Sequence, residues 1–142
     1  MSATKQSLGQ WIETLNDTLF IQPNDELALK AINEDVDSSL ITKHLLTSHH
    51  RINDNTYTYD QFKPGVQYAR STTTSTQDVF DIILEWENPE KGGGVVAVLS
   101  KWTIKDKASG EETKKTNVIV WEVKVVDGKR KLVGQTEVET VD

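Results

Sequence analysis

The sequence predicts an α+β domain in which helices from the first half of the chain pack on a sheet formed by the second half. Up to about residue 70, apolar residues recur every three or four positions, as on one face of a helix. From residue 79 onward they alternate with polar residues in four long segments, as in strands with one buried face. The length of 142 residues suits a single domain, residues 1–142, since domains of about 100–150 residues are commonest.

The first helix has clear start and stop signals. Ser7 and Gln10 form a capping box, in which each side chain bonds the other residue's backbone N–H. The apolar residues that follow at helical spacing predict a helix over residues 8–20. Pro23 cannot continue this helix and therefore ends it.

A second helix is expected immediately afterwards. Asn24 or Asp25 can cap it, and its apolar stripe predicts that it continues to about residue 40. Residues 41–58 lack a clear period, so we expect them to be irregular or briefly extended, with a turn at residues 53–55.

Asp60 is expected to cap a third helix that ends near Arg70. Pro64 is tolerable there because it falls in the first turn, where no intrahelical hydrogen bond is lost. The polar, β-branched run at residues 71–76 is interpreted as a connector.

Four strands are expected over residues 79–87, 95–105, 112–126 and 130–141. The first should bury one face, made of Phe80, Ile82, Leu84 and Trp86. On the third strand, the face that carries Trp121 should lie beneath the helices. Asp127–Gly128 predicts a two-residue hairpin into the last strand.

Residues 95–104 are apolar on both faces, unlike the other strands. Val95, Ala97 and Leu99 point one way, whereas Val96, Val98 and Trp102 point the other. The helices can cover only one side of the sheet, so a second molecule is expected to cover the other side. The sequence therefore predicts a homodimer through the outer sheet face.

The composition excludes several function classes. A net charge of −6 argues against nucleic acid as a partner, and zero cysteines exclude thiol nucleophiles and thiolate metal sites. The three histidines lack the four-residue helical spacing of a metal site, so no metal is predicted. No apolar run reaches the about 18 residues that a membrane helix requires, and the chain is expected to be cytoplasmic, with no membrane partner.

Short motifs add a family resemblance that spans nearly the whole chain. The segment Arg51–Asn55 is followed by Tyr59–Phe62 at the start of the third helix, and Asp127–Lys129 leads to Glu137 in the last strand. This layout resembles the nuclear transport factor two-like superfamily, in detail its SnoaL-like, polyketide cyclase-like members. The resemblance implies a cystatin-like, cone-shaped α+β barrel: three helices on a curved, mainly antiparallel sheet around an apolar pocket.

The resemblance also implies two possible functions. Catalytic members are cofactor-free cyclases, isomerases or dehydratases that use a buried acid or histidine on a polyketide, steroid-like or terpenoid molecule. Other members are non-catalytic, dimeric binding or interaction modules. Two departures from the catalytic pattern are that Pro64–Gly65 stands where relatives often carry a histidine, and that the sheet shows no obvious pair of inward carboxylates.

The candidate catalytic residues are Glu137 and His50. Glu137 matches an acidic position in the last strand of many relatives, and it can face either the pocket or, together with Glu139, the solvent. His49 and His50 should lie at the pocket's lip, where at most one can point inward. His44 is interpreted as a helix-end residue only.

The candidate ligand is a small apolar or aromatic molecule, because the chain has four tryptophans that can wall a cavity. Tyrosine hydroxyls can bond a ligand oxygen, although buried tyrosines and tryptophans more often serve as core. The candidate ligand-binding residues are Tyr57, Tyr68, Trp86, Trp102 and Trp121.

Overall fold

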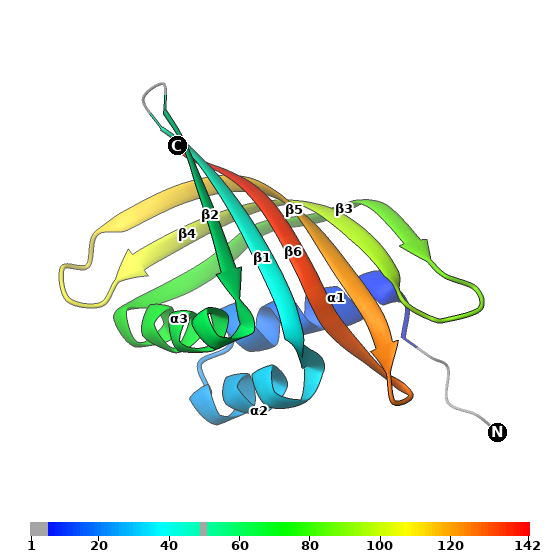
Figure 1. Ribbon diagram of the computed structural model, residues 1–142. Helices are drawn as coiled ribbons and strands as arrows, with labels where there is room; N and C mark the ends of the chain where they lie inside the picture. The colour runs from blue at the N-terminus through cyan, green and yellow to red at the C-terminus, as the bar shows by residue number, and fades with distance from the viewer. Residues whose placement is uncertain (1–5, 49–50) are drawn as a thin grey trace.

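The structure is a computed structural model that describes residues 6–48 and 51–142, with the backbone alone at residues 46–48 and 51–53. In the first half, three helical elements are followed by a pair of strands and a further helix, and the second half is a strand meander (Figure 1). The elements are α1 (Leu8–Asn16), the π-helix η1 (Asp17–Ile21), α2 (Asp25–Asp35), β1 (Val36–Ser48), β2 (Arg51–Thr58), α3 (Tyr59–Thr72), β3 (Thr73–Glu87), β4 (Gly94–Asp106), β5 (Glu112–Val126) and β6 (Lys129–Val141).

All six strands form one sheet, in the order β2-β1-β6-β5-β4-β3. Every neighbouring pair is antiparallel except β1 and β6, which run parallel. The C-terminal strand β6 is therefore placed next to the early strand β1, and together with β5 these two strands lie at the middle of the sheet. This arrangement confirms the predicted α+β class with a mainly antiparallel sheet.

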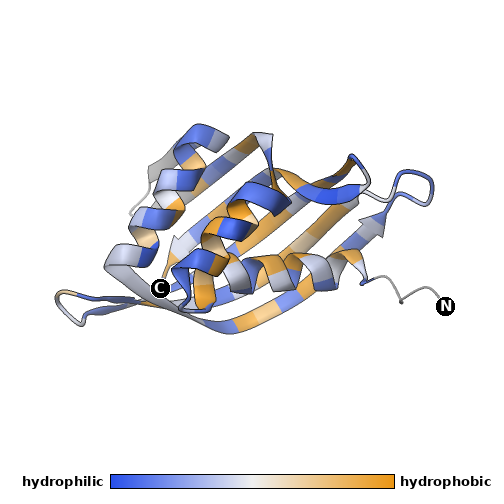
Figure 2. Cartoon of the chain, turned by 90° about the horizontal axis from the view of Figure 1, so that it is seen from below, coloured by the Kyte–Doolittle hydropathy of each residue, from blue (hydrophilic) through white to orange (hydrophobic). Residues whose placement is uncertain are grey.

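The helices cover one face of the sheet, which curves over them (Figure 1). Helix α1 packs on β3 and β4, α2 on β1 and β6, and α3 on β1 and β2. Seen from the helix side, hydrophobic and hydrophilic residues alternate along the strands (Figure 2). Trp121, Val98 and Leu132 are fully buried on this face, which confirms that the helices cover the Trp121 side.

The start of the first helix is as predicted. Ser7 Oγ accepts the backbone N–H of Gln10 at 3.2 Å, and Gln10 Oε1 accepts the backbone N–H of Ser7 at 3.1 Å. The helical path continues to Ile21, but its last five residues form a π-turn instead of α-helix. Such turns are uncommon and often occur at functional sites.

The predicted extent of the second helix is wrong. Helix α2 ends at Asp35, and the chain passes directly into β1. The apolar residues Ile32, Val36 and Leu40 stand four apart and are all buried, so the helical period continues across the boundary although the backbone does not. Residues 41–58 are likewise not irregular, because β1 and β2 pair as a hairpin and the expected turn at 53–55 lies inside β2.

The third helix begins at Tyr59, two residues earlier than an Asp60 cap predicts, because Thr58 is its N-cap. Gln61 Oε1 accepts the backbone N–H of Thr58 at 2.9 Å, as in a capping box. Residues 71–76 are not a connector, because α3 runs to Thr72 and β3 begins at the next residue.

Two irregularities in β3 change which residues face the helices. The pairing of β3 with β4 shifts between Gln77 and Val79 and again between Ile82 and Leu84. Ile82 pairs with the buried Val98, but Leu84 pairs with Ala97 of the opposite face. The predicted single face of β3 is therefore wrong: Leu84 and Trp86 lie on the outer face and are exposed.

Among the described residues, no helix is both long enough and apolar enough to cross a membrane.

Candidate functional site

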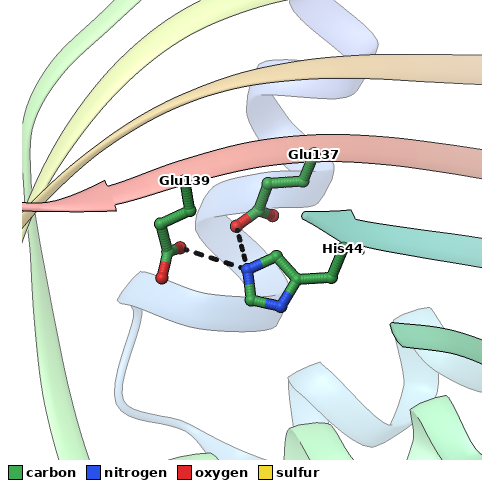
Figure 3. Close-up of side chains that lie close together, drawn as sticks. All are labelled: His44, Glu137 and Glu139. Atoms are coloured by element: carbon green, nitrogen blue, oxygen red, sulfur yellow. Dashed lines mark ion pairs between the residues drawn. The ribbon is translucent and has the colours of Figure 1, made fainter. Parts of the chain in front are cut away.

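Three ionisable side chains from two adjacent strands meet on the helix-covered face of the sheet. In the parallel register, His44 of β1 lies beside Glu137 of β6. Glu139 is two residues further along β6, and alternate residues of a strand share a face. Figure 3 shows both carboxylates turned toward the His44 ring. The two possible orientations of Glu137 are thus decided in favour of the inward one.

The distances within this cluster are short. His44 Nε2 lies 3.3 Å from Glu137 Oε1 and 3.7 Å from Glu139 Oε2. The nitrogen is within ion-pair distance of both carboxylates but is aligned for a hydrogen bond with neither. The expectation that the sheet has no pair of inward carboxylates is therefore wrong. So is the interpretation of His44 as a helix-end residue, because it lies in the middle of a central strand.

Three further side chains hold the carboxylates in place. Asn117 of β5 points Nδ2 at Glu137 Oε1, 3.3 Å away, and at Glu139 Oε2, 3.4 Å away. Gln135 Nε2 donates to Glu137 Oε2 at 3.3 Å, and Lys115 Nζ lies 3.0 Å from Glu139 Oε1. Each carboxylate thus has partners on both of its oxygens.

These contacts give the three groups different proton affinities. The two carboxylates, Glu137 first and then Glu139, raise the pKa of His44 from 6.5 to about 10, against the effect of partial burial. Burial raises the pKa of Glu137; His44 partly offsets this, and the nearby Glu139 carboxylate raises it further. Burial would also raise the pKa of Glu139, but His44, Glu137 and Lys115 hold it well below its usual range.

The arrangement can exchange protons with a small molecule. At neutral pH it contains an imidazolium at His44 and an ionised carboxylate at Glu139, beside Glu137, a carboxyl group whose pKa is raised by burial. The His44 side chain is 29% exposed, so the cluster is reachable from solvent. Groups whose environments drive their pKa values apart are typical of acid–base sites.

The cluster also has the residue types of a divalent metal site. One possible ligand atom from each of His44, Glu137 and Glu139 lies within 4.8 Å of the others. However, the Asn117 amide donates to the same two carboxylate oxygens that would face the ion, and the Lys115 ammonium is 3.0 Å from Glu139. The partly positive amide hydrogens of Asn117 and the charged ammonium group of Lys115 would both repel a cation bound here. The geometry favours a hydrogen-bonded cluster, and the absence of a metal stays a prediction.

Of the candidates named from the sequence, the structure brings Glu137 into the cluster and links Trp102 to it through Asn117. Trp102 Nε1 lies 3.2 Å from Asn117 Oδ1. Trp121 is fully buried on the same face, opposite Gln135 in the register. His50 lies outside the described residues, so its role stays a prediction.

The remaining three candidates are exposed, although the register places Tyr57 opposite Thr42, on the same face of the sheet as His44. Tyr68 projects from α3 with 71% of its surface exposed, and Tyr57 is exposed on the edge strand β2. Trp86 is 54% exposed and lines a groove of about 840 Å³ on the outer face, together with Ile41, Lys43 and Lys91. The structure therefore gathers none of these three around Glu137.

Sequence reasoning missed His44, Glu139 and Asn117. The sequence signal for His44 is weak, because Leu40 and Ile41 are both apolar and the next three residues are all polar, without the two-residue alternation of a strand. The helical spacing that continues into residue 40 also favoured a helix there. Asn117 has no local signal at all, since its role depends on the two neighbouring strands.

Comparison with known proteins reveals similarity in structure only. No protein-family model matches the sequence, and no curated protein matches it significantly. The solved structures that resemble the chain over nearly its whole length include the following three. A ketosteroid isomerase-like protein from Erwinia carotovora atroseptica has a TM-score of 0.60 and 12% identity, covering 90% of this chain and 92% of its own.

The second is a nuclear transport factor two-like protein from Cytophaga hutchinsonii, with a TM-score of 0.55, 15% identity and coverage of 94% and 98%. The third is a cystatin-like-fold protein of unknown function from Nostoc punctiforme, with a TM-score of 0.54, 11% identity and coverage of 98% and 96%. At such low identities these similarities show the fold alone.

Proposed function

We propose that this chain, which has the nuclear transport factor two-like fold, is a cofactor-free enzyme that moves a proton on a small apolar or aromatic carbonyl compound. The reaction would be an isomerisation, cyclisation or dehydration. The observation that carries the proposal is the position of Glu137, held between His44, Gln135 and Asn117 on the covered face of the sheet.

The chemistry follows from the charges around Glu137. In its ionised form Glu137 takes a proton from the carbon next to a carbonyl group and returns it at another position. The imidazolium of His44, 3.3 Å from Glu137, supplies the positive charge that stabilises the negative charge developing on the substrate. Glu139 and Lys115 keep His44 oriented and take no part in the proton transfer.

The test is proton exchange on a simple probe, 2-tetralone, a bicyclic ketone with acidic hydrogens beside its carbonyl. In D₂O, ¹H NMR should show exchange of these hydrogens faster with the protein than in buffer. Glu137→Gln keeps the size of the side chain but removes the base, so the protein-dependent rate should fall about 100-fold or more.

The matched control is Glu122→Gln, the same chemical change on the exposed outer face of β5. This variant should exchange the hydrogens beside the carbonyl of 2-tetralone as fast as the unmodified protein does. Exchange no faster than in buffer, or an equal rate for Glu137→Gln and the unmodified protein, would count against a catalytic Glu137.

A non-catalytic, dimeric binding module is the second candidate. The observation in its favour is the outer face, where apolar side chains of three adjacent strands are exposed: Ile41, Val118, Val120 and Val138. In that case the buried cluster would be a structural network. The protein would then have the mass of a dimer in solution but would not accelerate the exchange of 2-tetralone hydrogens.

A further inference from the structure

Asn117 contacts both carboxylates, and its amide can donate to them only if Nδ2 points toward them. Nδ2 faces Glu137 Oε1 and Glu139 Oε2. If the amide were reversed, the carbonyl oxygen would face two carboxylate oxygens and repel them. Another group must therefore hold the amide with Nδ2 toward the carboxylates.

Two buried donors on β4 supply that constraint. Trp102 Nε1 lies 3.2 Å from Asn117 Oδ1 and 2.6 Å from Ser100 Oγ, and the Ser100 hydroxyl is hydrogen-bonded to the same Oδ1. An indole nitrogen can only donate, so its partner on Asn117 must be the carbonyl oxygen. Because the Trp102 indole only donates, the oxygen of the Asn117 amide faces Trp102 and the nitrogen faces the carboxylates.

We propose that Trp102 is a positioning residue of the acid–base site: its indole N–H locks the Asn117 amide, which in turn holds both carboxylates beside His44. The description of the site as catalytic rests on the proposed function, but the locking of the amide does not. Trp102 acts through Asn117 and is assigned no contact with the substrate, in contrast to the ligand-binding role expected from the sequence.

The indole is itself held by the helix layer. The ring of Phe20, in the π-helix η1, packs edge-on against Trp102, with ring centres 6.2 Å apart and an angle of 87° between the planes. Such edge-to-face pairs are favourable arrangements of aromatic rings. The chain of contacts thus runs from Phe20 through Trp102 and Asn117 to Glu137 and His44.

The charged groups around His44 are known, which makes its protonation a suitable readout. Glu137 and Glu139 face it from β6, and Lys115 of β5 reaches it through Glu139. Its partner on β2, Asn55, is uncharged, and Lys63 of α3 donates to Asn33 instead. The midpoint of His44 titration therefore reports how closely the two carboxylates are held.

The test compares two tryptophan variants by NMR titration of the His44 ring. Trp102→Phe removes the locking N–H, so the carboxylates should move away and the midpoint should fall by at least about one pH unit. Trp121→Phe is the matched control: this indole is also buried on the same face, but its N–H has no partner within the described part of the chain. Its midpoint should stay unchanged.

Equal shifts in both variants, or none in either, would overturn the proposal. Asn117→Leu provides a second route if Trp102→Phe folds poorly, because it removes the amide but leaves the indole. It should lower the midpoint as much as Trp102→Phe, and the double variant should lower it no further, since both changes break one pathway. A further fall in the double variant would mean that Trp102 does not act through Asn117.

This titration needs no substrate, so it separates the two proposals. A shifted midpoint without any exchange of 2-tetralone would support the lock and reject the catalytic role. If exchange of 2-tetralone is lost in Glu137→Gln but the His44 midpoint is unshifted in Trp102→Phe, the catalytic role is supported and the lock is rejected.

Discussion

Glu137 and Glu139 are the same residue type, two positions apart on one strand, yet their surroundings give them opposite properties. Burial dominates at Glu137 and raises its pKa. At Glu139 the contacts with His44, Glu137 and Lys115 outweigh burial and lower its pKa. The chemical role of each carboxylate is therefore decided by its neighbours on β1 and β5 and not by its own identity.

His44 should make the stability of the protein depend on pH. Its pKa is about 10 in the folded protein and about 6.5 when unfolded, so the folded state binds the proton more tightly. Its stabilisation is fully present below pH 6.5 and is lost as the pH rises through 10. The free energy of unfolding, measured by urea denaturation, should fall over this window by at most about 1.4 kcal/mol per pH unit.

The variant His44→Gln isolates this effect, because it cannot gain a proton in this range. Its unfolding free energy should fall less than that of the unmodified protein between pH 6.5 and 10, while titrating groups that do not contact His44 act on both alike. Parallel curves for the two proteins would show that the carboxylates do not hold a proton on His44.

At the scale of elements, small departures from regular geometry decide which residues face the site. The bulge in β3 sends Trp86 to the outer face, and the π-turn of η1 carries Phe20 onto Trp102. A strict two-residue alternation along β3 predicts the wrong side for every residue beyond the bulge.

The start of β4 offers a test of how closely β3 and β4 approach. A Cβ added at Gly94 would lie 1.9 Å from the backbone oxygen of Trp86, which cannot move aside without disturbing the strand pair. Gly94→Ala should therefore destabilise the protein by roughly 1–3 kcal/mol, measured by thermal and urea unfolding.

Gly65→Ala is the matched control, in the exposed part of α3. Nothing lies within 4 Å of an added Cβ there. Since alanine stabilises a helix more than glycine does, this variant should be more stable than the unmodified protein by about 0.5–1 kcal/mol. A neutral Gly94→Ala would mean that β3 and β4 are further apart than the structure indicates.

At the scale of the whole molecule, the outer sheet face remains to be explained. Val118 and Val120 of β5 and Val138 of β6 are exposed, and Ile41 of β1 extends the apolar surface. Apolar surface of this kind, spread over adjacent strands, commonly marks an interface. The homodimer expected from the sequence stays a prediction, and the helix-free position of this surface supports it.

The dimer can be tested by size-exclusion chromatography with light scattering. The unmodified protein should have twice the mass of the chain, and Val120→Lys, which places a charge in the middle of the face, should have the mass of one chain. Tyr68→Lys, on the exposed side of α3, should stay dimeric. A monomeric unmodified protein would leave the outer face without the proposed partner.

The local pattern of the sequence was enough to determine the fold class, the capping box of α1, and the extents of β4, β5 and β6 to within one residue. These features depend on neighbours a few positions away, and hydrophobic period and capping chemistry record them directly. Glu137 was also named from its motif, but its direction was left open, because one residue of register reverses every side chain of a strand.

The site itself was decided by the tertiary structure. His44 on β1 is far in sequence from Asn117 and Glu139 on the hairpin of β5 and β6, and the three meet only because β6 pairs with β1. The same holds for Trp102, which acts through Asn117 of the adjacent strand. Contacts across strands depend on strand order, register and bulges, and these are set by the packing of the whole chain, which no local pattern records.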